Sequence, residues 1–169
     1  NNSAIVTDVF AWRNDRFSNI SYSRDSDTSV QTLRNYYVYA EDIDGDGVME
    51  LPSLITMKRV SPEQEGKQKC LIRWFAMDLE GREMDKLFTF HNYLGGWYMQ
   101  LASSWAARVS VDQDGGRYTF YVWDEDYRQA LDVFSIYVLT GGSREEDATV
   151  DGRFAFYRAE GVVYAAKLE

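Results

Sequence analysis

The chain has 169 residues, 27 of them acidic and 18 basic, so its formal net charge is −9. This charge has the wrong sign for neutralising phosphates, so DNA, RNA and anionic lipid are not expected partners. The one Cys cannot form an internal disulfide, and together with the one His it cannot complete a zinc site. No stretch approaches the ~20 apolar residues of a membrane helix.

The length fits a single domain, because domains usually run about 100–200 residues. We therefore expect one β-rich domain over residues 1–169. The first residues show no basic region followed by an apolar one, so no signal peptide is visible. The last residues stop directly after an apolar alternation. We expect the domain to have been excised from a longer chain.

The first part of the chain is predicted to place a loop between two strands. The polar residues 23–32 predict a loop or a hairpin tip, and 36–40 is typical of a strand. An Asp- and Gly-rich loop follows at 42–50, and 54–57 is typical of the next strand. Residues 61–69 are polar and charged, so we expect an exposed connection there.

Period-2 alternation of apolar and polar residues dominates the rest of the chain. Three hairpins follow from it: strands 70–77 and 87–91 around a turn at 78–81, residues 105–123 around a turn at 112–116, and strands 154–157 and 162–166 around a turn at 159–161. Residues 132–140 form one more apolar run. Only 124–131 indicates a helix, of one or two turns, with Asp124 or Asp126 as its cap.

These elements predict a mostly β fold. We expect an antiparallel sandwich or barrel built of hairpins, with at most one short helix. A partial, β-propeller-like arrangement is the alternative, because of the type of loop at 42–50.

One segment carries recognisable chemistry, and it reads Asp42-Ile43-Asp44-Gly45-Asp46-Gly47-Val48-Met49-Glu50. Carboxylates at i, i+2 and i+4 converge only if the chain curls tightly, which the two glycines permit. Ca²⁺ takes about 6–8 oxygen ligands, and such a loop supplies that kind of ligand. The predicted ligands are the side chains of Asp42, Asp44, Asp46 and Glu50 and the backbone carbonyl of Val48. The expected role of the ion is structural.

The loop follows the first nine positions of an EF-hand loop and then departs from it. Ser53 stands at the twelfth position, where an EF-hand needs a bidentate Glu, and Pro52 opposes an exit helix. The segment 36–57 instead resembles the Asp-x-Asp-Gly-Asp-Gly-x-x-Asp/Glu loops of FG-GAP and VCBS-type repeats. That resemblance implies Ca²⁺ held between two strands of an exported protein.

More widely, the chain beyond residue 30 resembles a family of bacterial exported lipoproteins with no assigned activity. Besides the acidic loop, the segments that carry this resemblance are Tyr36-Tyr37-Val38-Tyr39, Glu50-Leu51-Pro52, Phe90-His91-Asn92-Tyr93, Gly96-Trp97-Tyr98, Ser104-Trp105 and Asp151-Gly152-Arg153-Phe154. The resemblance implies an extracellular or cell-envelope location, with a lipid anchor if a lipobox precedes the chain.

Aromatic residues are plentiful, and core packing accounts for most of them. Trp97, Tyr121 and Trp123 are the candidates for a surface that binds a glycan or a protein, because Tyr121 and Trp123 share the strand face opposite Tyr118 and Phe120.

No catalytic signature is visible in the sequence. His91 is expected to be a packed or rim histidine, and Cys70 a buried, inert thiol. We therefore expect a non-enzymatic secreted or envelope domain with a structural Ca²⁺ loop, which binds a glycan or a protein. An exported glycan-active hydrolase that uses carboxylates is one alternative, and a structural spacer of a lipoprotein is another.

Overall fold

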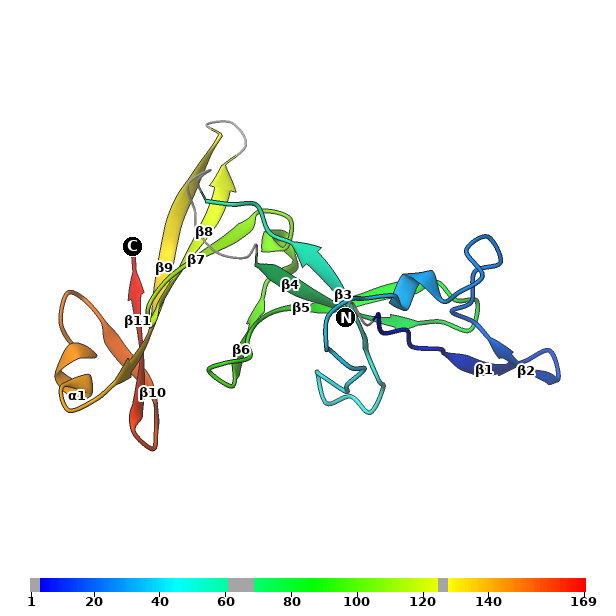
Figure 1. The fold of residues 1–169 in the computed structure, drawn as a ribbon, viewed down its shortest axis with the longest axis horizontal. Helices are drawn as coiled ribbons and strands as arrows, with labels where there is room; N and C mark the ends of the chain where they lie inside the picture. Colours follow the sequence, from blue (N-terminus) through cyan, green and yellow to red (C-terminus); the bar gives the residue numbers. More distant parts are fainter. Residues whose placement is uncertain (1–3, 61–68, 125–127) are drawn as a thin grey trace. The chain divides into compact units, whose positions relative to one another are not determined.

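The computed structural model describes residues 4–60, 69–124 and 128–169 (Figure 1). Strands make up 53% and helices 6%, which confirms the predicted mostly β fold. Its three antiparallel sheets are open, as in a β-sandwich, and none of them closes into a barrel within these three ranges.

The chain divides into two compact units, which are described separately below. Unit 1 contains Asn1–Ile55 and Cys70–Ala106, and unit 2 contains Thr56–Lys69 and Ala107–Glu169. The expectation of a single domain stays a prediction.

Unit 1 contains a two-stranded sheet of β1 (Phe10–Arg13) and β2 (Arg16–Asn19). Asn14 and Asp15, with φ of 52° and 58°, form the turn between the strands. Positive φ at both central positions is what a type I′ hairpin turn requires, and Asn and Asp tolerate it. The sequence predictions did not include this hairpin.

Unit 1 also contains the four-stranded sheet β3-β4-β5-β6, made of β3 (Leu51–Thr56), β4 (Cys70–Met77), β5 (Glu83–Asn92) and β6 (Trp97–Leu101). The β4–β5 pair confirms the predicted hairpin, although β5 begins four residues before the predicted residue 87. Its apolar core joins Val38, Ile72, Trp74 and Leu87, with the partly buried Ile43 and Leu54 packed against them.

The strand predicted at 36–40 is wrong, because the backbone there has other partners. The amide of Val38 donates to the carbonyl of Tyr36 at 2.9 Å. The carbonyl of Val38 accepts from Nε of the buried Arg34 at 2.5 Å. The alternation of exposure persists, with Val38 buried and Tyr37 and Tyr39 68% and 66% exposed, but no ladder forms.

Unit 2 is built around a five-stranded antiparallel sheet of order β10-β11-β9-β8-β7. Its strands are β7 (Val109–Asp114), β8 (Arg117–Asp124), β9 (Gln129–Thr140), β10 (Phe154–Ala159) and β11 (Val162–Leu168). The pairs β7–β8 and β10–β11 confirm two further predicted hairpins. The first of them turns at Gly115-Gly116 alone, because Asp112–Asp114 continue the ladder.

The helix predicted at 124–131 is wrong where the structure describes it. Asp124 ends β8 and pairs with Gln129, the first residue of β9, so strand pairing prevails over the weak helix signal. Asp126 lies outside the described residues. The short α-helix is instead α1 (Arg144–Asp147), and the 3₁₀ turns are η1 (Val30–Thr32) and η2 (Ser103–Trp105).

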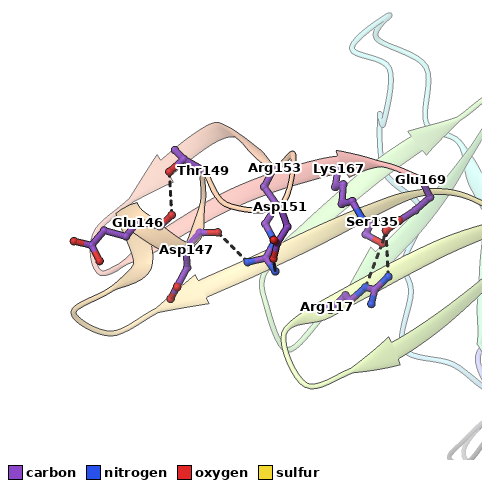
Figure 2. Close-up of polar contacts among 9 residues, drawn as sticks. All are labelled: Arg117, Ser135, Glu146, Asp147, Thr149, Asp151, Arg153, Lys167 and Glu169. Atoms are coloured by element: carbon purple, nitrogen blue, oxygen red, sulfur yellow. Dashed lines mark hydrogen bonds and ion pairs between the residues drawn. The ribbon is translucent and has the colours of Figure 1, made fainter.

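Polar contacts in unit 2 fasten the loop after α1 and the end of the chain (Figure 2). Arg153 donates to the Asp147 carbonyl at 2.9 Å, and its guanidinium lies 4.2 Å from the centre of the Tyr137 ring. Glu169 accepts from Ser135 at 2.8 Å and from Arg117 at 3.1 Å. These contacts join the loop after α1 and the end of the chain to the sheet of unit 2.

Within the described ranges, no helix has the length and apolar content needed to cross a bilayer.

Candidate functional site

The acidic loop of residues 42–50 lies in unit 1 and leads into β3. Glu41 and Glu50 close its base through two backbone hydrogen bonds, of 3.1 and 2.9 Å. Inside the loop, Gly45 and Gly47 adopt φ of 78° and 86°, a region that side chains with a Cβ rarely enter. Ile43 packs on the core beneath β4 and β5, which anchors the loop to the sheet.

Each of the four carboxylates of this segment uses one oxygen to fix the loop backbone. The N–H of Gly47 donates to Asp42 Oδ2 at 3.0 Å, and the N–H of Asp46 donates to Asp44 Oδ1 at 3.1 Å. The N–H of Val48 donates to Asp46 Oδ1 at 2.8 Å, and the N–H of Ile43 donates to Glu50 Oε2 at 3.2 Å. The second oxygen of each carboxylate accepts none of these backbone bonds. The loop therefore presents four oxygens from side chains that are already held in place.

Two of these second oxygens are buried without a hydrogen bond. In the part of the chain that the structure describes, Asp42 Oδ1 and Glu50 Oε1 are buried side-chain oxygens with no hydrogen-bond partner. The Glu50 side chain is 0% exposed, and its burial raises the pKa of its carboxyl group. Buried polar atoms are nearly always satisfied in folded proteins, so this pair of oxygens is a candidate for binding a cation.

The spacing of the carboxylates suits one ion. Asp42, Asp44 and Glu50 each offer an oxygen, and the three oxygens lie within 4.8 Å of one another. Two ligands of one Ca²⁺ are separated by at most about 5 Å, twice the usual Ca–O distance of roughly 2.3–2.6 Å. The structure thus brings together three of the predicted ligands.

Asp46, the fourth predicted side-chain ligand, is paired with a lysine. Its Oδ2 accepts from Nζ of Lys86, on β5, at 2.5 Å. The same ammonium lies 3.8 Å from Asp44 Oδ2 and 4.0 Å from Glu50 Oε1. The hydrogen bond between the two side chains lowers the pKa of Asp46 and raises the pKa of Lys86. Val48, the predicted backbone ligand, is 48% exposed, and its ligation stays a prediction.

Comparisons with protein-family models, with curated proteins and with solved structures found no match. The chemistry of this site therefore rests on its own residues.

The three predicted aromatic ligand-binding residues are half-buried and lie in different units. Trp97 is in unit 1, whereas Tyr121 and Trp123 are in unit 2, on β8. The Trp123 ring is covered by Nζ of Lys58 at 5.2 Å from its centre. A common binding platform for all three is thus not seen within either unit.

Trp97 instead lines a pocket of about 260 Å³ in unit 1, with Glu41, His91, Asn92, Tyr93, Gly96 and Tyr98. The His91 ring stacks on Tyr98 at 5.0 Å and on Tyr93 at 5.3 Å between ring centres. Burial lowers the pKa of His91, which keeps its imidazole neutral near pH 7. His91 is thus a packed histidine at a pocket rim, as the sequence predicted.

Two features of these sites were missed by sequence reasoning. Lys86 stands directly before the predicted strand 87–91, and no local signal relates it to a loop 40 residues earlier. Tyr93 belongs to a segment that carries the family resemblance, and that resemblance is the one signal that points to it, whereas Tyr98 directly follows the predicted binding residue Trp97.

Proposed function

We propose that the protein binds one Ca²⁺ in the loop 42–50 and that the ion stabilises unit 1 without taking part in a reaction. The single observation that supports this proposal is the set of second carboxylate oxygens, two of which are buried without a hydrogen bond. Asp42, Asp44 and Glu50 would hold the ion first, with Asp46 and the Val48 carbonyl completing the set. A set of protein oxygens favours Ca²⁺ over Mg²⁺, which keeps most of its water ligands.

The setting we propose is an exported, non-enzymatic bacterial domain, extracellular or in the cell envelope, with a lipid anchor if a lipobox precedes the chain. The resemblance of the acidic loop to FG-GAP and VCBS-type loops supports this setting. A chain with one Cys is also compatible with a domain stabilised by calcium rather than by disulfides. The hydrolase and spacer alternatives stay predictions.

Thermal unfolding tests the calcium proposal. Tryptophan fluorescence is a suitable signal, because Trp12, Trp74, Trp97 and Trp105 lie in unit 1 and only Trp123 lies in unit 2. At a Ca²⁺ concentration 100 times Kd, the free energy of unfolding rises by about 2.7 kcal/mol. For a chain of this size that corresponds to an increase in Tm of roughly 5–11 °C.

Asp42→Asn is the informative variant, because its side-chain carbonyl still accepts the Gly47 N–H while the charge is lost. We expect it to reduce the Ca²⁺-induced increase in Tm. Asp25→Asn removes one charge from an exposed loop of the same unit and is the matched control. A wild-type Tm that is equal in EDTA, Mg²⁺ and Ca²⁺ would contradict the proposal.

A second candidate function is supported by the aromatic pocket of unit 1. Tyr93 and Tyr98 are 49% and 54% exposed and stand beside Glu41 and Asn92, so stacking faces and hydrogen-bonding groups share one small pocket. At about 260 Å³ it is smaller than most drug-binding pockets, which span roughly 300–1,000 Å³. We propose that it accommodates one sugar ring of a glycan.

Glycan-array binding tests this second candidate. We expect Tyr98→Ala and Trp97→Ala to abolish binding, and Tyr37→Ala to leave it unchanged, because Tyr37 is 68% exposed and does not line the pocket. Wild-type protein that binds no glycan on the array would contradict the assignment.

A further inference from the structure

We propose that Lys86 is a tethered cation that neutralises the acidic loop when calcium is absent and is displaced when Ca²⁺ binds. This inference rests on the proposed calcium site, and it states how that site is regulated. Lys86 belongs to β5 and the loop belongs to residues 42–50, both within unit 1.

The position of Lys86 in the sheet is irregular. The register of β4 and β5 pairs Trp74 with Leu87 and then Phe75 with Asp85, so Lys86 is the extra residue of a β-bulge. A bulge bends the strand locally and redirects one side chain, and bulges often lie beside functional sites. Its neighbour Leu87 is in the core beneath the loop, while the Lys86 side chain is 28% exposed and reaches the loop.

The ammonium group of Lys86 approaches the oxygens that a metal ion would use. Oδ1 of Asp44 and of Asp46 each accepts a hydrogen bond from a backbone N–H, and Lys86 Nζ lies 3.8 and 2.5 Å from their Oδ2 atoms. Glu50 Oε2 accepts from the Ile43 N–H, and Lys86 Nζ lies 4.0 Å from Glu50 Oε1. A lysine that only held the carboxylates in place would contact the oxygens that do not bind the ion, whereas Lys86 lies at the second oxygens.

Lys86 and Ca²⁺ therefore compete for three of the four second oxygens. The lysine limits repulsion among the four carboxylates, so the loop keeps its fold in metal-free protein. For Asp44, Asp46 and Glu50 to bind Ca²⁺ with these oxygens, the ammonium must leave. Because the lysine is covalently attached, it opposes Ca²⁺ at every calcium concentration and sets the threshold at which the loop fills.

Calorimetric titration of the whole chain with CaCl₂ tests the competition, using wild type, Lys86→Gln, Lys86→Arg and Arg16→Gln. Two unit charges about 4 Å apart interact by at least ~1 kcal/mol even in water, and more near a protein surface. We expect Lys86→Gln to bind Ca²⁺ at least about fivefold more tightly than wild type and Lys86→Arg to bind no more tightly. Arg16 is exposed on β2, so Arg16→Gln controls for the change in net charge and should stay within about twofold of wild type.

The outcomes separate this inference from the calcium proposal. Lys86→Gln that binds Ca²⁺ as wild type does, or more weakly, overturns the inference and leaves the calcium site intact. Absence of Ca²⁺ binding in wild type and in every variant overturns the calcium proposal itself and, with it, the inference.

A second measurement keeps the positive charge of Lys86 and does not depend on how stable Lys86→Gln is. After reductive dimethylation with ¹³C, the Lys86 resonance is identified as the one missing in Lys86→Arg. We expect this resonance to move on addition of Ca²⁺ while the other lysine resonances stay in place. A Lys86 resonance unmoved at saturating Ca²⁺ overturns the displacement.

Discussion

Replacement of Glu50 by Gln should change stability in a way that depends on calcium. Glu50 is fully buried, one of its oxygens has no hydrogen bond among the described residues, and burial raises its pKa. Gln has the same shape, its carbonyl keeps the Ile43 bond, and its amide donates to a neighbouring carboxylate. An unsatisfied buried polar group costs about 1–3 kcal/mol, and the attraction of Lys86, 4.0 Å from Glu50 Oε1, offsets only part of this cost, so metal-free Glu50→Gln should be more stable than wild type.

The pH dependence has a defined sign. The folded pKa of Glu50 is raised above the ordinary 4.5, so the folded state binds the proton more tightly than the unfolded state does. The stability of metal-free wild type therefore falls as pH rises from 4.5 through the raised pKa. The advantage of Glu50→Gln should be smallest below pH 4.5 and should grow as pH rises through the raised pKa.

Calcium should reverse this effect. With Kd of about 10⁻⁴–10⁻³ M, as in extracellular calcium modules, 10 mM Ca²⁺ adds roughly 1.4–2.7 kcal/mol to wild type. Glu50→Gln should gain much less. Urea unfolding in EDTA and in 10 mM CaCl₂ measures both differences, with the exposed Glu160→Gln of unit 2 as control. A Glu50→Gln protein that is less stable than wild type in EDTA, or that gains as much from Ca²⁺, would refute the reasoning.

Three further predictions concern the rest of the structure. Trp74→Phe removes the bond that Nε1 donates to Thr89 Oγ1 at 2.8 Å, between two side chains with no exposed surface, and should cost at least about 1–3 kcal/mol in urea unfolding; unchanged stability would show that this bond contributes little. Arg153→Lys loses the planar cover of the Tyr137 ring and should cost about 0.5–1 kcal/mol in the same assay, whereas an effect below the error of the fit would argue against that contact. Burial raises the pKa of Tyr93 to about 12, so the folded state keeps a proton that the unfolded state loses above pH 10. Stability should therefore fall between pH 10 and 12 in wild type and fall less in Tyr93→Phe, and equal slopes in this range would contradict the prediction.

Local sequence signals were sufficient for most of the hairpins. In the pair β7–β8, alternating apolar residues on both sides of an Asp- and Gly-rich turn indicated two strands, and the turn residues indicated that the strands form a hairpin. The same agreement held for β10–β11 around Gly161. The curled loop at 42–50 was also foreseeable, because Gly45 and Gly47 occupy positive φ.

Contacts between distant residues decided the elements that local signals missed. The sequence pattern at 36–40 is that of a strand. The Arg34 side chain, however, donates a hydrogen bond to the Val38 carbonyl, so this segment does not pair with a neighbouring strand. Residues 129–131 have no strong preference of their own, and their pairing with β8 makes them strand. For the same reason Lys86 could not be assigned to the loop, because its position depends on a bulge that appears only when β5 pairs with β4.

Equilibrium dialysis of the wild-type chain against ⁴⁵Ca²⁺ tests the calcium site most directly. The proposed site predicts one Ca²⁺ per chain, with Kd no weaker than about 10⁻³ M, and weaker binding by Asp42→Asn. Binding of no Ca²⁺ at millimolar concentrations, or equal binding by wild type and Asp42→Asn, would contradict it.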